Sequence, residues 1–239
     1  MSFAQKTWLP VALPFALLFA STGTPALAQS TQFLPEIDAH LTVNSYFRTY
    51  LQAEDDRDAG TSSQFSIGPS AQFYLKPLLK LKKITSLDLD DAKPRPVVLE
   101  LGYRYLTAPN VAPTNRLQPA LTFHLPLTAG LLLSDRNRAD LDWKSGEFTW
   151  RYRNKLTLER GLAAHSYHFI PYVAVEPYYV DKYHKWSTTD LYAGGLFPVG
   201  KHVQFDAYYE HENNTGKKPN QSKNDIGLTL NLYFALEKK

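Results

Sequence analysis

The chain has 239 residues, enough for one domain, and its formal net charge is only +3. The sequence has no strongly basic block, which argues against nucleic acid as a partner. It has no cysteine, so its stability does not come from disulfides. Its 15 tyrosines outnumber its 13 phenylalanines. This bias suits aromatic rings at a membrane–water boundary, although a secreted β-sandwich rich in tyrosine would share it.

The N-terminus has the three-part layout of a secretory signal peptide. Lys6 supplies an early positive charge, and the apolar run that follows is shorter than the roughly 20 residues that a spanning helix needs. A small-residue A-x-A stretch ends at Ala28. We therefore expect cleavage between Ala28 and Gln29, which removes residues 1–28 and leaves residues 29–239 as the mature domain.

The mature chain alternates between apolar and polar residues with a period of two, which predicts about 10 strands. Most are about ten residues or longer, the length that crosses a membrane at a tilt, whereas soluble strands average about five or six. We expect an all-β fold, an antiparallel up-and-down transmembrane β-barrel with both termini periplasmic. The expected strands are Ile37–Tyr50, Phe65–Leu75, Val97–Tyr105, Leu117–Leu125, Leu131–Trp143, Phe148–Leu158, Tyr167–Tyr179, Ser187–Phe197, Val203–Tyr209 and Ile226–Phe234.

The last predicted strand resembles the terminal recognition signal of outer-membrane proteins. In that signal a polar residue, a glycine and spaced apolar residues lead to a terminal aromatic residue. We assign this assembly signal to Gly227, Leu230, Leu232 and Phe234. The resemblance implies that the barrel-assembly machinery is a partner.

The connections between strands are expected to alternate between short periplasmic turns and longer outer loops. Leu125–Gly130 and Pro198–Lys201 are short and fall on the periplasmic side. Lys76–Pro96 falls on the same side but is long, so it extends its flanking strands, forms a short surface helix, or hides a hairpin that raises the count to 12. The segments expected outside are Gln52–Ser62, Lys144–Gly146, Asp181–Trp186 and Glu212–Asn224.

Charged residues recur on the polar faces of the predicted strands. A polar interior can hold them only if they pair, because burying an unpaired charge is costly. Two interpretations stay open: the pairs only hold the barrel shut, or they line a selective channel or binding site. The expected interior charge network comprises Glu100, Arg104, Arg116, Arg136, Arg138, Asp140, Arg151, Arg153, Glu176, Asp206 and Glu210.

Two motifs in the C-terminal half carry a family resemblance. Arg151 and Arg153 form an R-x-R strand, and a later strand has Pro171 and Tyr172 followed by Glu176. This order resembles the domain-of-unknown-function family 2490, uncharacterised proteins predicted to be outer-membrane barrels. The resemblance implies a barrel fold in the bacterial outer membrane and supplies no established reaction.

His211 is the only candidate for a catalytic residue, and we assign none firmly. Its segment is similar to those of outer-membrane phospholipases and lipid A deacylases, in which a serine two residues after the histidine attacks an ester. Asn213 occupies that position here and cannot act as a nucleophile. A serine from another strand, such as Ser166, would have to replace it.

We expect no cofactor and no metal site, since the histidines are scattered along the chain. The main interpretation is a non-enzymatic outer-membrane barrel, either a small pore or a structural and binding protein, with lipids and lipopolysaccharide as partners and no nucleic acid. An outer-membrane lipid hydrolase and a soluble secreted β-protein are the alternatives. The oligomeric state does not follow from the sequence.

Overall fold

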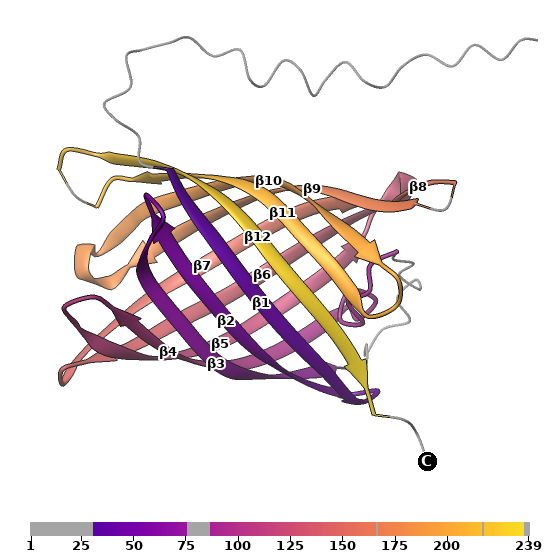
Figure 1. Cartoon of the computed structure of the whole chain (residues 1–239), viewed down its shortest axis with the longest axis horizontal. Coiled ribbons are helices and arrows are strands. Elements are labelled where there is room, and N and C mark those ends of the chain that lie inside the picture. Colours follow the sequence, from indigo (N-terminus) through magenta and orange to yellow (C-terminus); the bar gives the residue numbers. More distant parts are fainter. Residues whose placement is uncertain (1–30, 76–86, 166, 217, 237–239) are drawn as a thin grey trace, which may run out of the picture.

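The computed structural model describes residues 31–75, 87–165, 167–216 and 218–236, which are almost entirely β-strand (Figure 1). No helix in these ranges is long and apolar enough to cross a membrane. The strands are β1 (Thr31–Asn44), β2 (Phe47–Asp58), β3 (Thr61–Leu75), β4 (Val97–Ala108), β5 (Val111–Pro126), β6 (Leu131–Lys144), β7 (Glu147–Arg160), β8 (Leu162–Ala164), β9 (Tyr167–Val180), β10 (Lys185–Val199), β11 (Val203–Asn214) and β12 (Gln221–Ala235).

The strands form a closed barrel. Each strand from β1 to β7 pairs with the next, β7 pairs with β9, and β9 to β12 continue the circuit. The short β8 pairs only with β9, so eleven strands make the barrel wall. β12 closes the barrel by pairing with β1 in parallel, because strands that alternate in direction leave a parallel pair when their number is odd. The predicted all-β barrel is therefore confirmed, but its closure is mixed rather than purely antiparallel.

The parallel closure changes the expected placement of the chain ends. Because β1 and β12 run in the same direction, Thr31 and Ala235 lie at opposite ends of the barrel (Figure 1). We call these the Thr31 end and the Ala235 end. The expectation that both termini share one side fails for the described residues. For the described residues the predicted grouping of the connections holds. Leu125–Gly130 and Pro198–Lys201 lie at the Ala235 end, and the segments expected outside lie at the Thr31 end.

The eleventh wall strand arises in the N-terminal part of the chain. The predicted strand Ile37–Tyr50 is interrupted by a tight turn after Asn44, whose side-chain Oδ1 accepts a hydrogen bond from the Tyr46 amide. The chain then continues as β2 through residues that were expected to form a loop. The second turn is confined to Ala59 and Gly60, which both have positive φ as a two-residue hairpin turn requires.

The polarity of the barrel is reversed relative to a soluble protein. Large apolar side chains such as Leu101 (49% exposed) and Leu191 (50% exposed) point outward from the strands. Charged side chains such as Arg48 (1% exposed) and Asp140 (0% exposed) are buried inside. Inward and outward residues alternate along each strand, as the period-two pattern predicts.

Three polar side chains form a seam on the outer face of β6 and β7. Asp135 and Asn137 on β6 and Asn154 on β7 point outward and bond to one another, with Asn154 Nδ2 donating to Asp135 Oδ1 at 2.6 Å and to Asn137 Oδ1 at 3.1 Å. The group satisfies part of its own hydrogen-bonding capacity.

Residues 87–96, which we call the inner segment, lie within the Ala235 end of the barrel. Ala92 packs with Tyr74 of β3 and Val98 of β4. Neither a surface helix nor an additional hairpin is formed by the inner segment. The remainder of the predicted long connection, residues 76–86, lies outside the described residues.

Candidate functional site in the charged interior

Two cavities lie inside the described part of the barrel. A cavity of about 530 Å³ lies toward the Thr31 end, and a second of about 310 Å³ lies toward the Ala235 end. A layer of polar side chains borders both of them. This layer consists of Asp38, Tyr50, Arg136, Lys155, Asp206 and Asn231.

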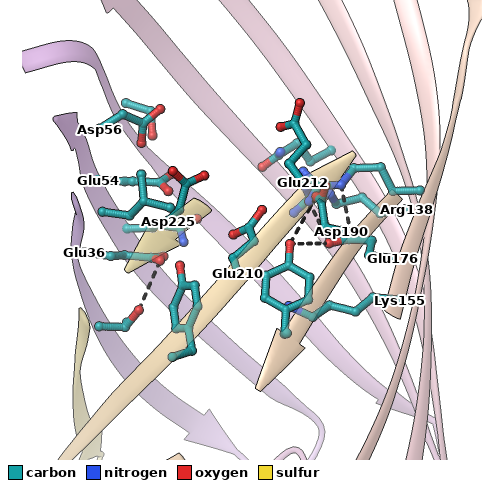
Figure 2. A pocket seen from close by; sticks show the side chains of 18 of the residues that line it. Glu36, Glu54, Asp56, Arg138, Lys155, Glu176, Asp190, Glu210, Glu212 and Asp225 are labelled. Carbon is teal, nitrogen blue, oxygen red and sulfur yellow. Dashed lines mark hydrogen bonds and ion pairs between the residues drawn. The ribbon is translucent and has the colours of Figure 1, made fainter. Parts of the chain in front are cut away.

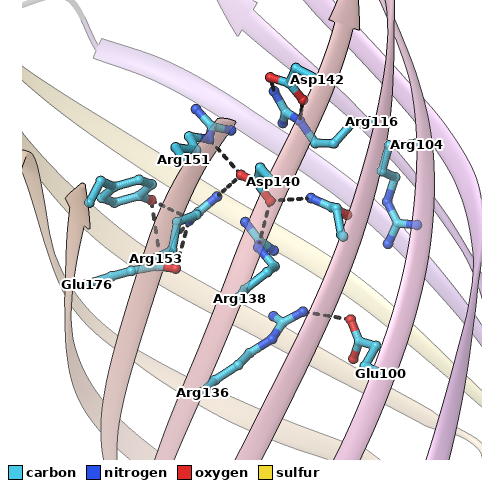
Figure 3. Close-up of polar contacts among 12 residues, drawn as sticks. Glu100, Arg104, Arg116, Arg136, Arg138, Asp140, Asp142, Arg151, Arg153 and Glu176 are labelled. Carbon is cyan, nitrogen blue, oxygen red and sulfur yellow. Dashed lines mark hydrogen bonds and ion pairs between the residues drawn. The ribbon is translucent and has the colours of Figure 1, made fainter. Parts of the chain in front are cut away.

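One side of the larger cavity is cationic. We call this side the arginine wall, and it lies on β4 to β7. Its basic side chains alternate with outward-pointing residues, so the strand period brings them to one surface (Figure 3). The wall consists of Arg104, Arg116, Arg136, Arg138, Arg151, Arg153 and Lys155.

Asp140 is the centre of the arginine wall. Its carboxylate lies 3.1 Å from Arg138 Nε and 2.6 Å from Arg151 Nε, and Arg153 Nη1 is 3.8 Å away. Gln118 Nε2 donates a further hydrogen bond at 3.0 Å. A single buried carboxylate thus lies between three guanidinium groups, whose mutual repulsion it reduces (Figure 3).

Further carboxylates pair with individual arginines of the wall. Arg153 contacts Glu176 through Nε and Nη2, both at 2.8 Å. Arg116 contacts Asp142 in the same two-pronged way, at 2.6 and 2.9 Å. These paired geometries match the fixed fork of a guanidinium group and are the stronger kind of ion pair. Arg136 makes a single contact with Glu100 at 2.8 Å.

The opposite side of the larger cavity is acidic. We call it the acidic wall, and it comes from β1, β2, β10, β11 and β12 (Figure 2). In the described part of the chain, the only ion pair made by a member of this wall joins Lys223 Nζ to Asp225 at 2.8 Å. The wall consists of Glu36, Asp38, Glu54, Asp56, Asp190, Asp206, Glu210, Glu212 and Asp225.

The two walls make the cavity electrically polar across its width. Most arginines have a carboxylate partner, yet the seven cations of the arginine wall outnumber the four carboxylates that contact them, Glu100, Asp140, Asp142 and Glu176. On the acidic wall, carboxyl groups outnumber cations, since Lys223 is their one ion-pair partner among the described residues. Low-dielectric walls concentrate such a field inside a cavity. A solute there would meet opposite charges on its two sides.

The predicted charge network divides between these walls. Asp206 and Glu210 belong to the acidic wall, where Asp206 accepts a hydrogen bond from Tyr172 at 3.0 Å. Arg104 forms no ion pair within the described residues; it donates instead to Gly68 O and Ser70 Oγ, both at 3.1 Å. The other eight predicted residues lie in or against the arginine wall, namely Glu100, Arg116, Arg136, Arg138, Asp140, Arg151, Arg153 and Glu176.

Sequence reasoning missed most of the acidic wall. Glu36, Glu54 and Asp56 belong to the two strands whose boundaries were misplaced, so their shared inward face was not recognised. Gly60 was a turn signal in the sequence, and a tight turn there would have extended the alternation through Glu54 and Asp56.

Arg48 anchors the inner segment at the smaller cavity. Its Nη1 atom contacts Asp90 at 2.5 Å and Asp91 at 2.9 Å, while its Nε donates to Gln72 at 2.9 Å. Asp91 also accepts hydrogen bonds from Thr42 and Tyr74, each at 2.8 Å. One buried cation from β2 therefore holds two consecutive carboxylates inside the barrel.

Two further contacts fasten the inner segment. Lys93 forms a short ion pair with Glu159 of β7, and Gln204 of β11 donates to Asp88 at 2.9 Å. Burial raises the pKa of Asp88 to about 6, although Lys93 opposes the shift. Burial acts in the same direction on Asp90, but the attraction of Arg48 and other cations outweighs it and lowers the pKa of that carboxyl.

The assembly-signal residues all lie on β12. Gly227 is buried against the ring of Tyr208, where an added Cβ would come within 1.9 Å of the ring carbon Cζ. Leu230, Leu232 and Phe234 alternate with the inward residues and belong to the outward face.

The remaining predicted residues lie apart from the interior. His211 of β11 is on the outward face. The predicted cleavage site at Ala28 and Gln29 lies outside the described residues, as does Ser166. In the part of the chain that is described, no three histidine, aspartate or glutamate side chains converge in a way that would hold a metal ion.

Comparison with known proteins gives one match. The model of a family described as "Protein of unknown function (DUF2490)" matches residues 93–223. The matched range is more than half of the 239 residues and contains the whole arginine wall. No curated protein and no solved structure gives a significant match. The site is therefore interpreted from its own geometry.

Proposed function

Since the chain belongs to the DUF2490 family of proteins of unknown function, we propose a function from its geometry: an integral outer-membrane barrel that binds small solutes carrying both charges. The inner segment closes the Ala235 end, so the protein retains a solute and does not conduct ions freely. The solute enters from the Thr31 end, where the larger cavity lies.

The reversed polarity of the barrel is the observation that carries the membrane location. A soluble barrel keeps apolar side chains inside, whereas this barrel exposes Leu51, Leu101 and Leu191 and buries Asp140 and Glu176. A closed barrel in lipid satisfies its backbone hydrogen bonds internally and can turn apolar residues outward. The same face in water would be a large aggregation-prone patch.

The polar field across the larger cavity supports the choice of solute. A zwitterion can direct its anionic group to unneutralised cations such as Arg104 and Lys155 and its cationic group to Glu54 and Glu210. A simple anion or cation gains from one wall but is repelled by the other. The volume of about 530 Å³ suits a small molecule.

Conductance across a planar lipid bilayer tests the closed state. The native barrel should give no steady current, whereas Arg48→Ala should give stable openings, because Asp90 and Asp91 lose their shared partner. Arg57→Ala is the matched control, since the exposed side chain of Arg57 pairs with Asp55 at the other end of the barrel. A native current equal to that of Arg48→Ala would rule out closure by the inner segment.

A further inference from the structure

Three side chains on the outer face of the barrel form a hydrogen-bonded chain. His211 on β11 lies directly opposite Asn224 on β12, and its Nδ1 atom is 2.8 Å from Asn224 Oδ1. Ser222, two residues before Asn224, places its Oγ 3.4 Å from His211 Nε2. Alternate residues of a strand share a face, and diagonal neighbours on paired strands are within reach. The strand pairing therefore brings serine, histidine and asparagine together.

The hydrogen bonds specify the state of the imidazole ring. The Asn224 side-chain oxygen can only accept, so His211 Nδ1 carries the proton, and Nε2 presents its lone pair toward Ser222 Oγ. Tyr209 donates a second hydrogen bond to the same oxygen at 2.6 Å, which holds the amide in this orientation. This is the tautomer that a histidine needs to act as a general base toward a serine hydroxyl.

The surroundings match an amphiphilic substrate. The three residues lie near the Thr31 end of β11 and β12. The next outward-facing pair toward the Ala235 end is Tyr209 (41% exposed) and Ile226 (52% exposed). Ser222 itself is exposed. An acyl chain can lie along the apolar face while its ester group reaches the serine. Asn213, which faces Ser222 across the strand pair, offers an amide donor for the carbonyl oxygen.

We propose that Ser222, His211 and Asn224 form a catalytic site for hydrolysis of acyl esters at the lipid–water boundary. The proton of Ser222 Oγ moves to His211 Nε2 as Oγ bonds to the carbonyl carbon, and the ester C–O bond breaks as the same proton passes to the alcohol. Water then adds to the acyl–serine ester, releases the fatty acid, and restores the serine hydroxyl. Asn224 and Tyr209 are positioning residues. This activity is independent of the interior cavity.

Sequence reasoning identified His211, found asparagine where a serine was expected two residues later, and named Ser166 as the example of a serine from another strand. The serine instead comes from the neighbouring strand, in a segment that was expected to be a loop. Only the register of β11 against β12, in which His211 faces Asn224 and Asn213 faces Ser222, reveals the arrangement.

Covalent labelling tests the nucleophile. The full barrel, folded in detergent micelles, is treated with an alkyl fluorophosphonate and digested, and the modified residue is located by mass spectrometry. The adduct is expected on Ser222 in the native protein and is expected to fall by about 100-fold or more in His211→Ala. Ser62→Ala, at a serine that contacts Asp55 near the same end, should label as the native protein does. A native barrel in which Ser222 stays unlabelled overturns the proposal.

Kinetics separate catalysis from structural effects. Hydrolysis of 4-nitrophenyl laurate and of phosphatidylethanolamine vesicles should fall by about 10³-fold in Ser222→Ala and His211→Ala, and remain at the native rate in His168→Ala. Asn224→Ala and Tyr209→Phe should lower kcat with little change in KM, as expected for positioning residues. Heat-modifiable migration on a gel confirms that each variant is folded. Native hydrolysis that persists in folded Ser222→Ala contradicts the proposal.

Discussion

Buried charged side chains in the interior are stabilised by ion pairs with side chains of opposite charge. Asp140 is the clearest case, because it lies fully buried among Arg138, Arg151 and Arg153. Burying any one of these arginines costs desolvation free energy, and the three guanidinium groups would also repel one another. The carboxylate therefore stabilises the arginine wall more than any single pair would suggest.

Asp140→Asn should destabilise the folded barrel by about 3–5 kcal/mol, because it removes the charge that the three arginines share. Equilibrium urea unfolding in lipid vesicles provides the measurement. Asp142→Asn is the matched control on the same strand and face. Its ion pair is with Arg116 alone, so its cost should be smaller, about 1.5–3 kcal/mol. Equal losses in both variants would show that Asp140 has no special role.

At the scale of single elements, the inner segment is a switchable part of the structure. Ion pairs and polar hydrogen bonds hold most of it, and its buried apolar cluster is small, joining Ala92 to Tyr74 and Val98. The protonation of its own carboxylates therefore changes how firmly it docks. The pKa of Asp88 is raised to about 6 by burial, whereas that of Asp90 is lowered because Arg48 outweighs burial.

Acidification from pH 7 to pH 5 should tighten the docking of the inner segment. The docked state binds the Asp88 proton more strongly than a released segment does, so this contribution is complete below about pH 4 and is lost as pH rises through 6. The contribution of Asp90 has the opposite sign and disappears only in stronger acid. Hydrogen-exchange protection of the Lys93 and Arg95 amides, corrected for intrinsic rates, should rise up to about tenfold.

Asp88→Asn supplies the control for that measurement. This variant keeps the shape of the side chain but cannot titrate, so the protection of the two amides should become nearly independent of pH over the same interval. A native barrel with no change in protection between pH 7 and pH 5 would mean that Asp88 does not regulate docking.

The strands also show what sequence alone can predict. The arginines of the wall could be grouped from alternation alone, because β4 to β7 lie close to their predicted positions, and the structure places these arginines along the larger cavity. The acidic wall could not be predicted in this way, since a polar strand segment such as the end of β2 has the composition of a loop. Ser222 and Asn224 were missed for the same reason, and pairing register across two strands is not encoded in either strand alone.

At the scale of the whole molecule, the closed barrel separates an apolar exterior from a charged interior. Eleven wall strands close through a parallel pair, and this odd number was not readable from the sequence, where a turn at residues 45–46 lay hidden within one predicted strand. We propose that lipid, not water, surrounds this apolar exterior.

Arginine substitutions at two positions along the barrel axis test whether lipid surrounds the exterior. Leu101 lies midway along β4, whereas Leu127 lies at a turn at the Ala235 end, and their exposures are similar at 49% and 46%. In lipid vesicles, urea unfolding should show that Leu101→Arg costs about 2–4 kcal/mol and Leu127→Arg about 0–1 kcal/mol, because the cost of a lipid-facing arginine depends on depth. If both variants unfold like the native protein and the native protein is stable in water without lipid or detergent, the membrane account is wrong.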